Sequence, residues 1–195
     1  MKTIGLTGGI GMGKSTAAQV FRRAHIPVFD ADAAVHALQA PGGRALPEIA
    51  AAFPGTVVAG RLDRAALRRA VLGQVSALRR LEAILHPLVR GMERAFLARA
   101  RRAGARAVVL DIPLLFETGG QRRVDHVVVV SAPRAVQLHR VRLRGRMSTA
   151  QIEAVIAQQT PDRHKRRHAD TLVRTGLSRH HAQRTLRRLI RELQG

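Results

Sequence analysis

The chain has 195 residues and a formal net charge of +21, from 34 basic and 13 acidic side chains. It contains no cysteine, which excludes disulfides and thiolate metal sites. Hydrophobic residues make up 46% of the chain, enough for a packed core, but no apolar run of about 18 residues predicts a transmembrane helix.

Short apolar runs alternate with helical patterns, which is typical of an α/β fold with a parallel sheet. The expected strands are 3–7, 27–30, 107–112, 125–131 and 171–173. The expected helices are 13–24, 31–39, 64–72, 76–86, 88–103, 133–145, 148–159 and 178–193, with loops around a short helical piece in 40–60. Asp63 and Ser76 are candidate N-caps, and Pro87 predicts a kink or break.

A glycine-rich loop after the first strand is the most informative segment. Gly8, four residues and then Gly13-Lys14-Ser15 match the phosphate-binding P-loop pattern in full. Glycines let the backbone approach a phosphate closely, and the N–H groups of the loop and helix start form an anion nest. Lys14 would reach the β- and γ-phosphates, and the Ser15 hydroxyl would bind Mg²⁺. A plain glycine-rich turn is the alternative, and the strand before and the helix after argue against it.

The loop therefore predicts a nucleoside triphosphate with Mg²⁺ as its ligand. The expected nucleotide-binding residues are Gly9, Ile10, Gly11, Met12, Gly13, Lys14, Ser15 and Thr16.

Carboxylates follow two of the expected strands. In parallel α/β sheets ligands bind beyond the carboxyl ends of the strands. Asp32 could there take a proton from a substrate hydroxyl, or it could simply cap the next helix. Asp30 is expected to be structural. Asp111 could support Mg²⁺, directly or through water, or cap the following loop.

Arginines recur in residues 138–150, where Arg140 and Arg144 share a helix face and Arg142 and Arg146 lie beside them. Like charges at this spacing repel, and a shared anion would offset the repulsion. The segment is predicted to be an arginine-bearing lid over the transferring phosphates. A solvated basic face is the alternative.

Two further segments are candidates for substrate contact. His86 and Arg90 are one helical turn apart and could face an anion, although a helix kink with a solvated arginine is the simpler interpretation. Leu114, Leu115 and Phe116 follow a buried strand and could be core or could line an acceptor pocket.

The net charge increases along the chain, by +2, +7 and +12 over residues 1–60, 61–120 and 121–195. Such a field attracts nucleic acid, anionic membranes or phosphorylated small molecules. With five Phe and no Tyr or Trp, stacking platforms for bases are scarce. We expect arginine forks for an anionic substrate combined with compositional bias, without specific nucleic-acid binding.

The run Lys165-Arg166-Arg167 is expected to be a solvated surface. His164 and His168 have the i, i+4 spacing of a metal pair, but they lie in the most positive stretch of the chain. No zinc site is predicted.

Taken together, these segments resemble the dephospho-CoA kinase family. The resemblance rests on the P-loop with Asp30-Ala31-Asp32, on His86-Pro87 with Arg90, and on Asp111-Ile112-Pro113-Leu114-Leu115-Phe116-Glu117. Asp125, Gln137-Leu138 with Arg140, Gln159 and Ala169-Asp170 follow in the family's order.

The resemblance implies ATP-dependent phosphorylation of the ribose 3′-hydroxyl of dephospho-CoA, the last step of coenzyme A synthesis. It implies a nucleotide-binding core (1–39 and 104–195) with a lid at about 138–150, and a helical acceptor domain (40–103). By position Asp32 matches the catalytic base. Lys14 and Arg140 match catalytic residues and Arg144 a nucleotide contact. His86, Arg90 and the 114–117 segment, including Glu117, match the acceptor site.

The chain departs from the family pattern in three places. Met12 replaces a serine, at a position expected to act mainly through its backbone. Gly145 follows Arg144 where the family has an acidic residue or Asn, and Arg174-Thr175-Gly176 replaces Asp-Asn-x-Gly.

Two other functions remain open from the sequence: another P-loop small-molecule kinase, and a basic nucleic-acid-binding ATPase. The segments at 86–90 and 111–117 argue against the first. The first residues lack a signal peptide pattern, so the expected location is the cytoplasm, as a monomer or weak oligomer and without membrane association.

Overall fold

The computed structural model describes residues 1–145 and 147–194, so Arg146 of the predicted lid lies outside the described residues. Two compact units are formed. One joins Met1–Phe29 to Ala100–Gly195, and the other is Asp30–Arg99. The second unit is therefore an insertion in the chain of the first. The functional roles assigned to the predicted core and insertion stay predictions.

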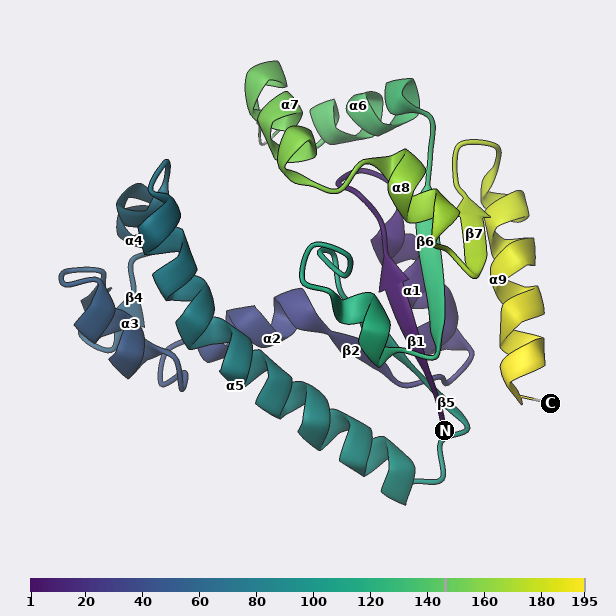
Figure 1. Cartoon of the computed structure of the whole chain (residues 1–195), viewed down its shortest axis with the longest axis horizontal. Helices are drawn as coiled ribbons and strands as arrows, with labels where there is room; N and C mark the ends of the chain where they lie inside the picture. The colour runs from purple at the N-terminus through teal and green to yellow at the C-terminus, as the bar shows by residue number, and fades with distance from the viewer. Residues whose placement is uncertain (146, 195) are drawn as a thin grey trace. The chain divides into compact units, whose positions relative to one another are not determined.

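A five-stranded parallel sheet with helices around it forms the first unit, which confirms the predicted fold class (Figure 1). The strands are β1 (Lys2–Thr7), β2 (Val28–Asp30), β5 (Ala107–Asp111), β6 (His126–Ser131) and β7 (Thr171–Arg174), in the order β2-β5-β1-β6-β7. The helices of this unit are α1 (Lys14–Arg23), α6 (Arg134–Arg142), α7 (Thr149–Gln158), α8 (Asp162–Arg167) and α9 (Arg179–Gln194), with a 3₁₀ turn at Gly120–Arg123. The helix α8 was missed because its basic run has no apolar periodicity.

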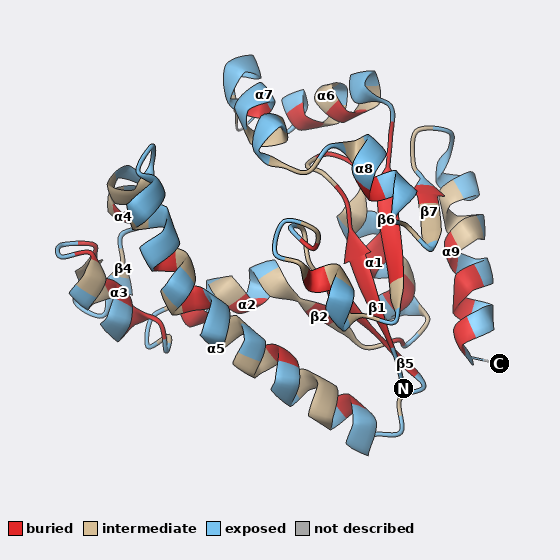
Figure 2. Cartoon of the chain, viewed as in Figure 1, coloured by how far each residue is buried: buried red, intermediate tan, exposed pale blue. Residues whose placement is uncertain are grey.

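The alternation of strand side chains divides the core between the two faces of the sheet. On one face, Leu6, Val128 and Val130 pack with α1 and α9. On the other face, Val127 and Val129 pack around Leu115, whose side chain is fully buried. Burial on both faces is the reason that these strands are continuous apolar runs, and Figure 2 shows β1 and β6 as buried after their first residues.

The second unit is mostly helical. Its helices are α2 (Ala31–Leu38), α3 (Leu46–Ala52), α4 (Arg64–Val71) and most of α5 (Val75–Arg102). Asp63 caps α4 as predicted, since its side chain accepts hydrogen bonds from the N–H groups of Ala65 and Ala66. A small antiparallel hairpin, β3 (Val57–Val58) with β4 (Arg61–Leu62), was not predicted. The glycines and prolines around it were interpreted as loop.

Of the kink or break predicted at Pro87, the break is wrong, because α5 runs through Pro87 as one helix of 28 residues. Ser76 lies inside this helix, so it is not the N-cap. Leu81 and Leu85 before the proline, and Leu88 and Met92 after it, pack into one hydrophobic cluster. Packing on both sides of the missing backbone hydrogen bond outweighs the local cost of the proline.

Candidate functional site

The P-loop leaves the carboxyl end of β1, the central strand of the sheet. A Cβ on Gly8 would lie 2.6 Å from the carbonyl oxygen of Val130, so the loop passes too close to β6 for any side chain there. Gly13 ends the loop with φ of +95°, a conformation that favours glycine, and α1 begins at Lys14.

The first turn of α1 is open to an anion. The N–H of Ala17 makes the first bond back to Gly13 O. Helix geometry thus leaves the N–H groups of Lys14, Ser15 and Thr16 to a ligand, and the last two residues are exposed. This arrangement suits the β- and γ-phosphates that the sequence predicts here.

Ile10 differs from the other residues of the predicted nest. Its N–H donates to Gln159 Oε1 at 3.2 Å, and its carbonyl accepts from Gln137 Nε2 at 2.8 Å. The Ile10 N–H is thus paired with a side chain of the protein, and nucleotide binding by Ile10 stays a prediction. Neither glutamine was assigned a role from the sequence.

Met12 also corrects an expectation, since its role extends beyond its backbone. The Met12 side chain is 3% exposed and lies in the core, and its sulfur accepts a hydrogen bond from Ala132 N at 3.0 Å. A serine at this position would lose that apolar packing.

The phosphate lysine is paired with the carboxylate at the end of β5. Lys14 Nζ donates to Asp111 Oδ1 at 2.5 Å, and the two side chains are 16% and 3% exposed. Parallel register brings them together, because Asp111 lies beside Leu6 of β1, just before the P-loop. Asp111 is therefore at the edge where a metal-supporting carboxylate was predicted.

Arg140 is held by the loop that follows β7. Its guanidinium donates to the Thr175 hydroxyl at 3.0 Å and to the Thr175 carbonyl at 2.8 Å. The same hydroxyl donates to the Met12 carbonyl at 2.7 Å. Thr175, one of the departures from the family pattern, thus links the arginine to the P-loop.

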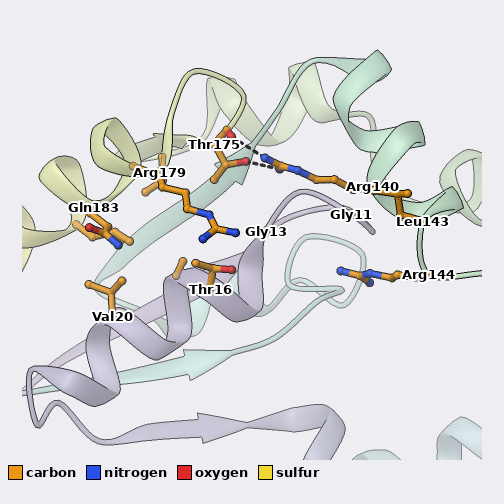
Figure 3. A pocket seen from close by; sticks show the side chains of 14 residues that line it. Gly11, Gly13, Thr16, Val20, Arg140, Leu143, Arg144, Thr175, Arg179 and Gln183 are labelled. Carbon is orange, nitrogen blue, oxygen red and sulfur yellow. Dashed lines mark hydrogen bonds between the residues drawn. The ribbon is translucent and has the colours of Figure 1, made fainter.

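A cavity of about 300 Å³ lies beside this link (Figure 3). Apolar side chains of α1, β7 and α9 line part of it, and Arg140, Arg144 and Arg179 lie at its edges. Arg179 points toward Gly13 and Thr16 in Figure 3. The sequence analysis did not predict Arg179 as a site residue. The available signal was its position at the start of α9, the helix that follows the last strand of the sheet. An apolar cavity with arginines next to a P-loop suits a nucleotide.

Gly145 ends the turn after α6. It has φ of +63°, and its N–H bonds to Arg142 O. A glycine suits this left-handed conformation better than the acidic residue or Asn of the family pattern.

Residues 114–117, which follow β5, differ in burial, so they do not all face a possible acceptor. Leu115 is fully buried and favours the core alternative, whereas Leu114 is 42% exposed. Phe116 contacts His164 and His168 edge-on, with ring centroids 6.2 Å apart in each pair.

Glu117 and Lys165 form an ion pair, with Glu117 Oε1 2.9 Å from Lys165 Nζ. The Lys165 side chain is only 1% exposed, so the expectation of a solvated Lys165 is wrong. Glu117 Oε1 also accepts from Thr160 N at 2.7 Å. Burial alone would raise the pKa of Glu117, but the hydrogen bonds and charge that stabilise its carboxylate outweigh burial and lower it.

This pair predicts a pH-dependent contribution to stability. Because the pKa of Glu117 is lower in the folded chain, its contribution is present above the unfolded value of about 4.3 and is lost as the pH falls through the folded value. We expect Glu117→Gln to be less stable than wild type at neutral pH, with the difference shrinking below about pH 4. Urea unfolding of both chains across this range measures it.

The exposed Glu153 supplies a control, since its side chain is 47% exposed. Glu153→Gln should show little or no such convergence. A difference between Glu117→Gln and wild type that stays constant with pH would contradict the assignment.

In the second unit, Asp30 caps α2, because its Oδ1 accepts from Ala33 N at 3.0 Å. The capping alternative for Asp32 is therefore wrong. Asp32 lies in the first turn of α2 and is exposed. Its role as a base stays a prediction.

His86 and Arg90 are brought together on α5. They line a shallow cavity of about 390 Å³ with Arg94, which the sequence analysis did not include. The three side chains are exposed and basic or titratable, so an anion is the matching ligand.

Two structural absences hold for the described parts of the chain. Within residues 1–145 and 147–194, no three His, Asp or Glu side chains are grouped as ligands for a metal ion. Over the same residues, no helix has the length and hydrophobicity needed to cross a membrane.

A complete P-loop on the central strand of a parallel sheet, with a lysine on a strand-end carboxylate, defines the chain as a P-loop nucleotide-binding protein. The sequence profile of the family described as dephospho-CoA kinase matches residues 2–179. The chain belongs to the dephospho-CoA kinase family.

Named relatives support the family assignment, and solved structures share the fold. The chain is 55% identical to a dephospho-CoA kinase of Gluconobacter oxydans, over 99% of this chain and 98% of the relative. It is 54% identical to one of Mesorhizobium japonicum, over 100% and 98%. It is similar to the crystal structure of TT1252 from Thermus thermophilus, with a TM-score of 0.85, 37% identity and 100% and 98% coverage. The dephospho-CoA kinase of Campylobacter jejuni has a TM-score of 0.68 and 21% identity, with the same coverage.

Proposed function

We propose that the chain transfers the γ-phosphoryl group of ATP to the ribose 3′-hydroxyl of dephospho-CoA. The 3′-oxygen attacks the γ-phosphorus, the bond to the β,γ-bridging oxygen breaks, and ADP leaves. The proton of the hydroxyl passes to Asp32. The observation that carries the proposal is the complete P-loop with Lys14 on Asp111, in a chain that belongs to this family.

Each part of the site has an expected role. The N–H groups of the first turn of α1 hold the phosphates, and Lys14 moves from Asp111 to the β- and γ-phosphate oxygens. Arg140 and Arg144 stabilise charge on the transferring group. Within the helical unit, His86 and Arg90 bind anionic groups of the acceptor.

Mg²⁺ fits the donor set at the P-loop. The exposed Ser15 hydroxyl and the Asp111 carboxylate are oxygen ligands of the kind that Mg²⁺ prefers. Ser15 would bind the ion directly and Asp111 through water. The ion would neutralise charge on the β- and γ-phosphates.

One incubation tests the function. The chain with ATP, Mg²⁺ and dephospho-CoA should produce CoA and ADP in equal amounts. Turnover of a nucleoside monophosphate or a sugar in its place would support another small-molecule kinase. ATP hydrolysis stimulated by nucleic acid, without CoA, would overturn the proposal in favour of a nucleic-acid-dependent ATPase.

Thr175 gives a prediction specific to this chain. Thr175→Val removes the donor to Met12 O and an acceptor for Arg140, and we expect the KM for ATP to rise about thirtyfold, at about 1 kcal/mol for each of the two hydrogen bonds. Thr175→Ser keeps the hydroxyl and should stay close to wild type. Initial rates at varied ATP measure both, and equal KM values for the two variants would contradict the link.

A further inference from the structure

Two glutamines hold Ile10 from both sides. Gln159 accepts the Ile10 N–H and Gln137 donates to the Ile10 carbonyl. Gln137 is only 3% exposed. The residue at the apex of the P-loop is therefore fixed by side chains that are 127 and 149 positions away in sequence.

The two glutamines come from the two ends of the α6–α7 segment. Gln137 lies in α6, and Gln159 is the C-cap of α7. An Arg134–Glu153 ion pair joins the two helices. The segment between these glutamines contains the predicted lid. It is therefore bonded to Ile10 of the P-loop at both of its ends.

Further contacts anchor each end. On the α6 side, Arg140 bonds to Thr175, whose hydroxyl bonds to the P-loop at Met12. On the α7 side, Thr160 donates to Glu117, which pairs with the buried Lys165. Neither end of the segment can shift far without changing a bond to the P-loop or to the edge of the sheet.

The space around Gly9 supports the same arrangement independently. A Cβ on Gly9 would lie 3.2 Å from Gln159 Oε1 and 3.3 Å from Gln137 Nε2. Both amide groups therefore converge on the Gly9–Ile10 backbone, and a side chain at residue 9 would push them away.

We propose that Gln137 and Gln159 are positioning residues that set the shape of the P-loop from both ends of the α6–α7 segment. They act through Ile10 and do not contact the phosphates. Because both ends meet at one residue, the geometry of the phosphate-binding N–H groups and the position of the α6–α7 segment are set together. Nucleotide affinity and the exclusion of water from the transferring group should then depend on both glutamines.

The opposite polarity of the two bonds provides the test. A carboxylate can accept a hydrogen bond but cannot donate one. Gln159→Glu keeps an acceptor for the Ile10 N–H, whereas Gln137→Glu places a carboxylate against the Ile10 carbonyl. Both variants add one carboxyl group beside the same residue, but Gln137 is buried and Gln159 is half-buried. The neutral variants Gln137→Met and Gln159→Met are therefore measured beside them, so that the cost of burying a charge is separated from the loss of a hydrogen bond. Gln158→Glu, at an exposed neighbour, is the matched control.

Binding of a non-hydrolysable ATP analogue with Mg²⁺, measured by calorimetry, is the first readout. We expect Gln137→Glu to raise the Kd at least tenfold more than Gln159→Glu does, and Gln158→Glu to match wild type. The second readout is ADP formed per CoA, which should rise above one in Gln137→Glu and stay near one in Gln159→Glu. A purely structural role would lower the melting temperature without this polarity-dependent difference.

Equal Kd values for the two glutamate variants, or values equal to that of Gln158→Glu, would overturn the proposal. If Gln137→Glu does not fold, the neutral variants Gln137→Met and Gln159→Met decide alone. Each should raise the Kd about fivefold or more, and unchanged binding in both would overturn it. The ADP-per-CoA readout rests on the proposed function, but the Kd readout does not. A wild-type chain that binds nucleotide and makes no CoA would refute the proposed function alone.

Discussion

Asp32→Asn is expected to lower kcat by about 10²- to 10⁴-fold, the usual contribution of a positioned general base. The amide cannot take the proton of the acceptor hydroxyl. The KM for ATP should change little, because Asp32 lies outside the P-loop and its arginine-lined cavity. Steady-state rates at varied ATP and dephospho-CoA separate the two effects.

Asp30 offers a matched control two residues away. Asn is as good an N-cap as Asp, so Asp30→Asn should keep the cap on Ala33 and retain most activity. If Asp32→Asn turned over at a near-normal rate, Asp32 would not be the base. If both variants failed equally, a shared structural role in α2 would explain the loss.

Lys14→Ala is expected to abolish most activity, since it removes the cation that we propose binds the β- and γ-phosphates. It also leaves Asp111, which is 3% exposed, without its lysine. Loss of a partner from a buried pair costs about 3–5 kcal/mol, so a fall in stability should accompany the loss of rate. Rates and urea unfolding are both needed.

A double variant separates these effects. Lys14→Met with Asp111→Asn removes both charges, and we expect it to recover stability relative to Lys14→Ala without recovering turnover. A KM for ATP and a turnover rate close to those of wild type, in either variant, would contradict the phosphate role of Lys14. Restored activity in the double variant would assign the lysine a structural role.

Sequence patterns were sufficient to predict those elements whose structure is set by residues close together in the chain. The apolar runs of β1, β5 and β6 predict buried parallel strands, and the P-loop glycines predict the turn into α1. These features depend on residues close together in the chain. The fold class and the family followed from them and from the order of the motifs.

The errors concern contacts between distant segments. Lys165 looked solvated in its basic run, but Glu117, 48 positions earlier, holds it in the interior. Pro87 looked like a break, but α5 is held by packing from both sides. The polarity of the bonds at Ile10 and the position of Arg179 depend on how α6, α7 and α9 meet the P-loop, and no spacing in the sequence encodes that.

The place of β1 in the sheet affects how the chain is made. Both strands beside β1 come from after the insertion, because Lys2 pairs with Ala107 in β5 and Ile4 with His126 in β6. At about 5–20 residues per second, a ribosome needs roughly 5–20 s after β1 before β5 is synthesised. The inserted unit has its own hydrophobic cluster within residues 35–92 and can fold during that interval. The apolar strand β1 cannot pair until β5 and β6 have been synthesised, and such long-range pairing slows folding. During synthesis, the apolar strand before the P-loop is therefore exposed without its sheet partners and open to aggregation.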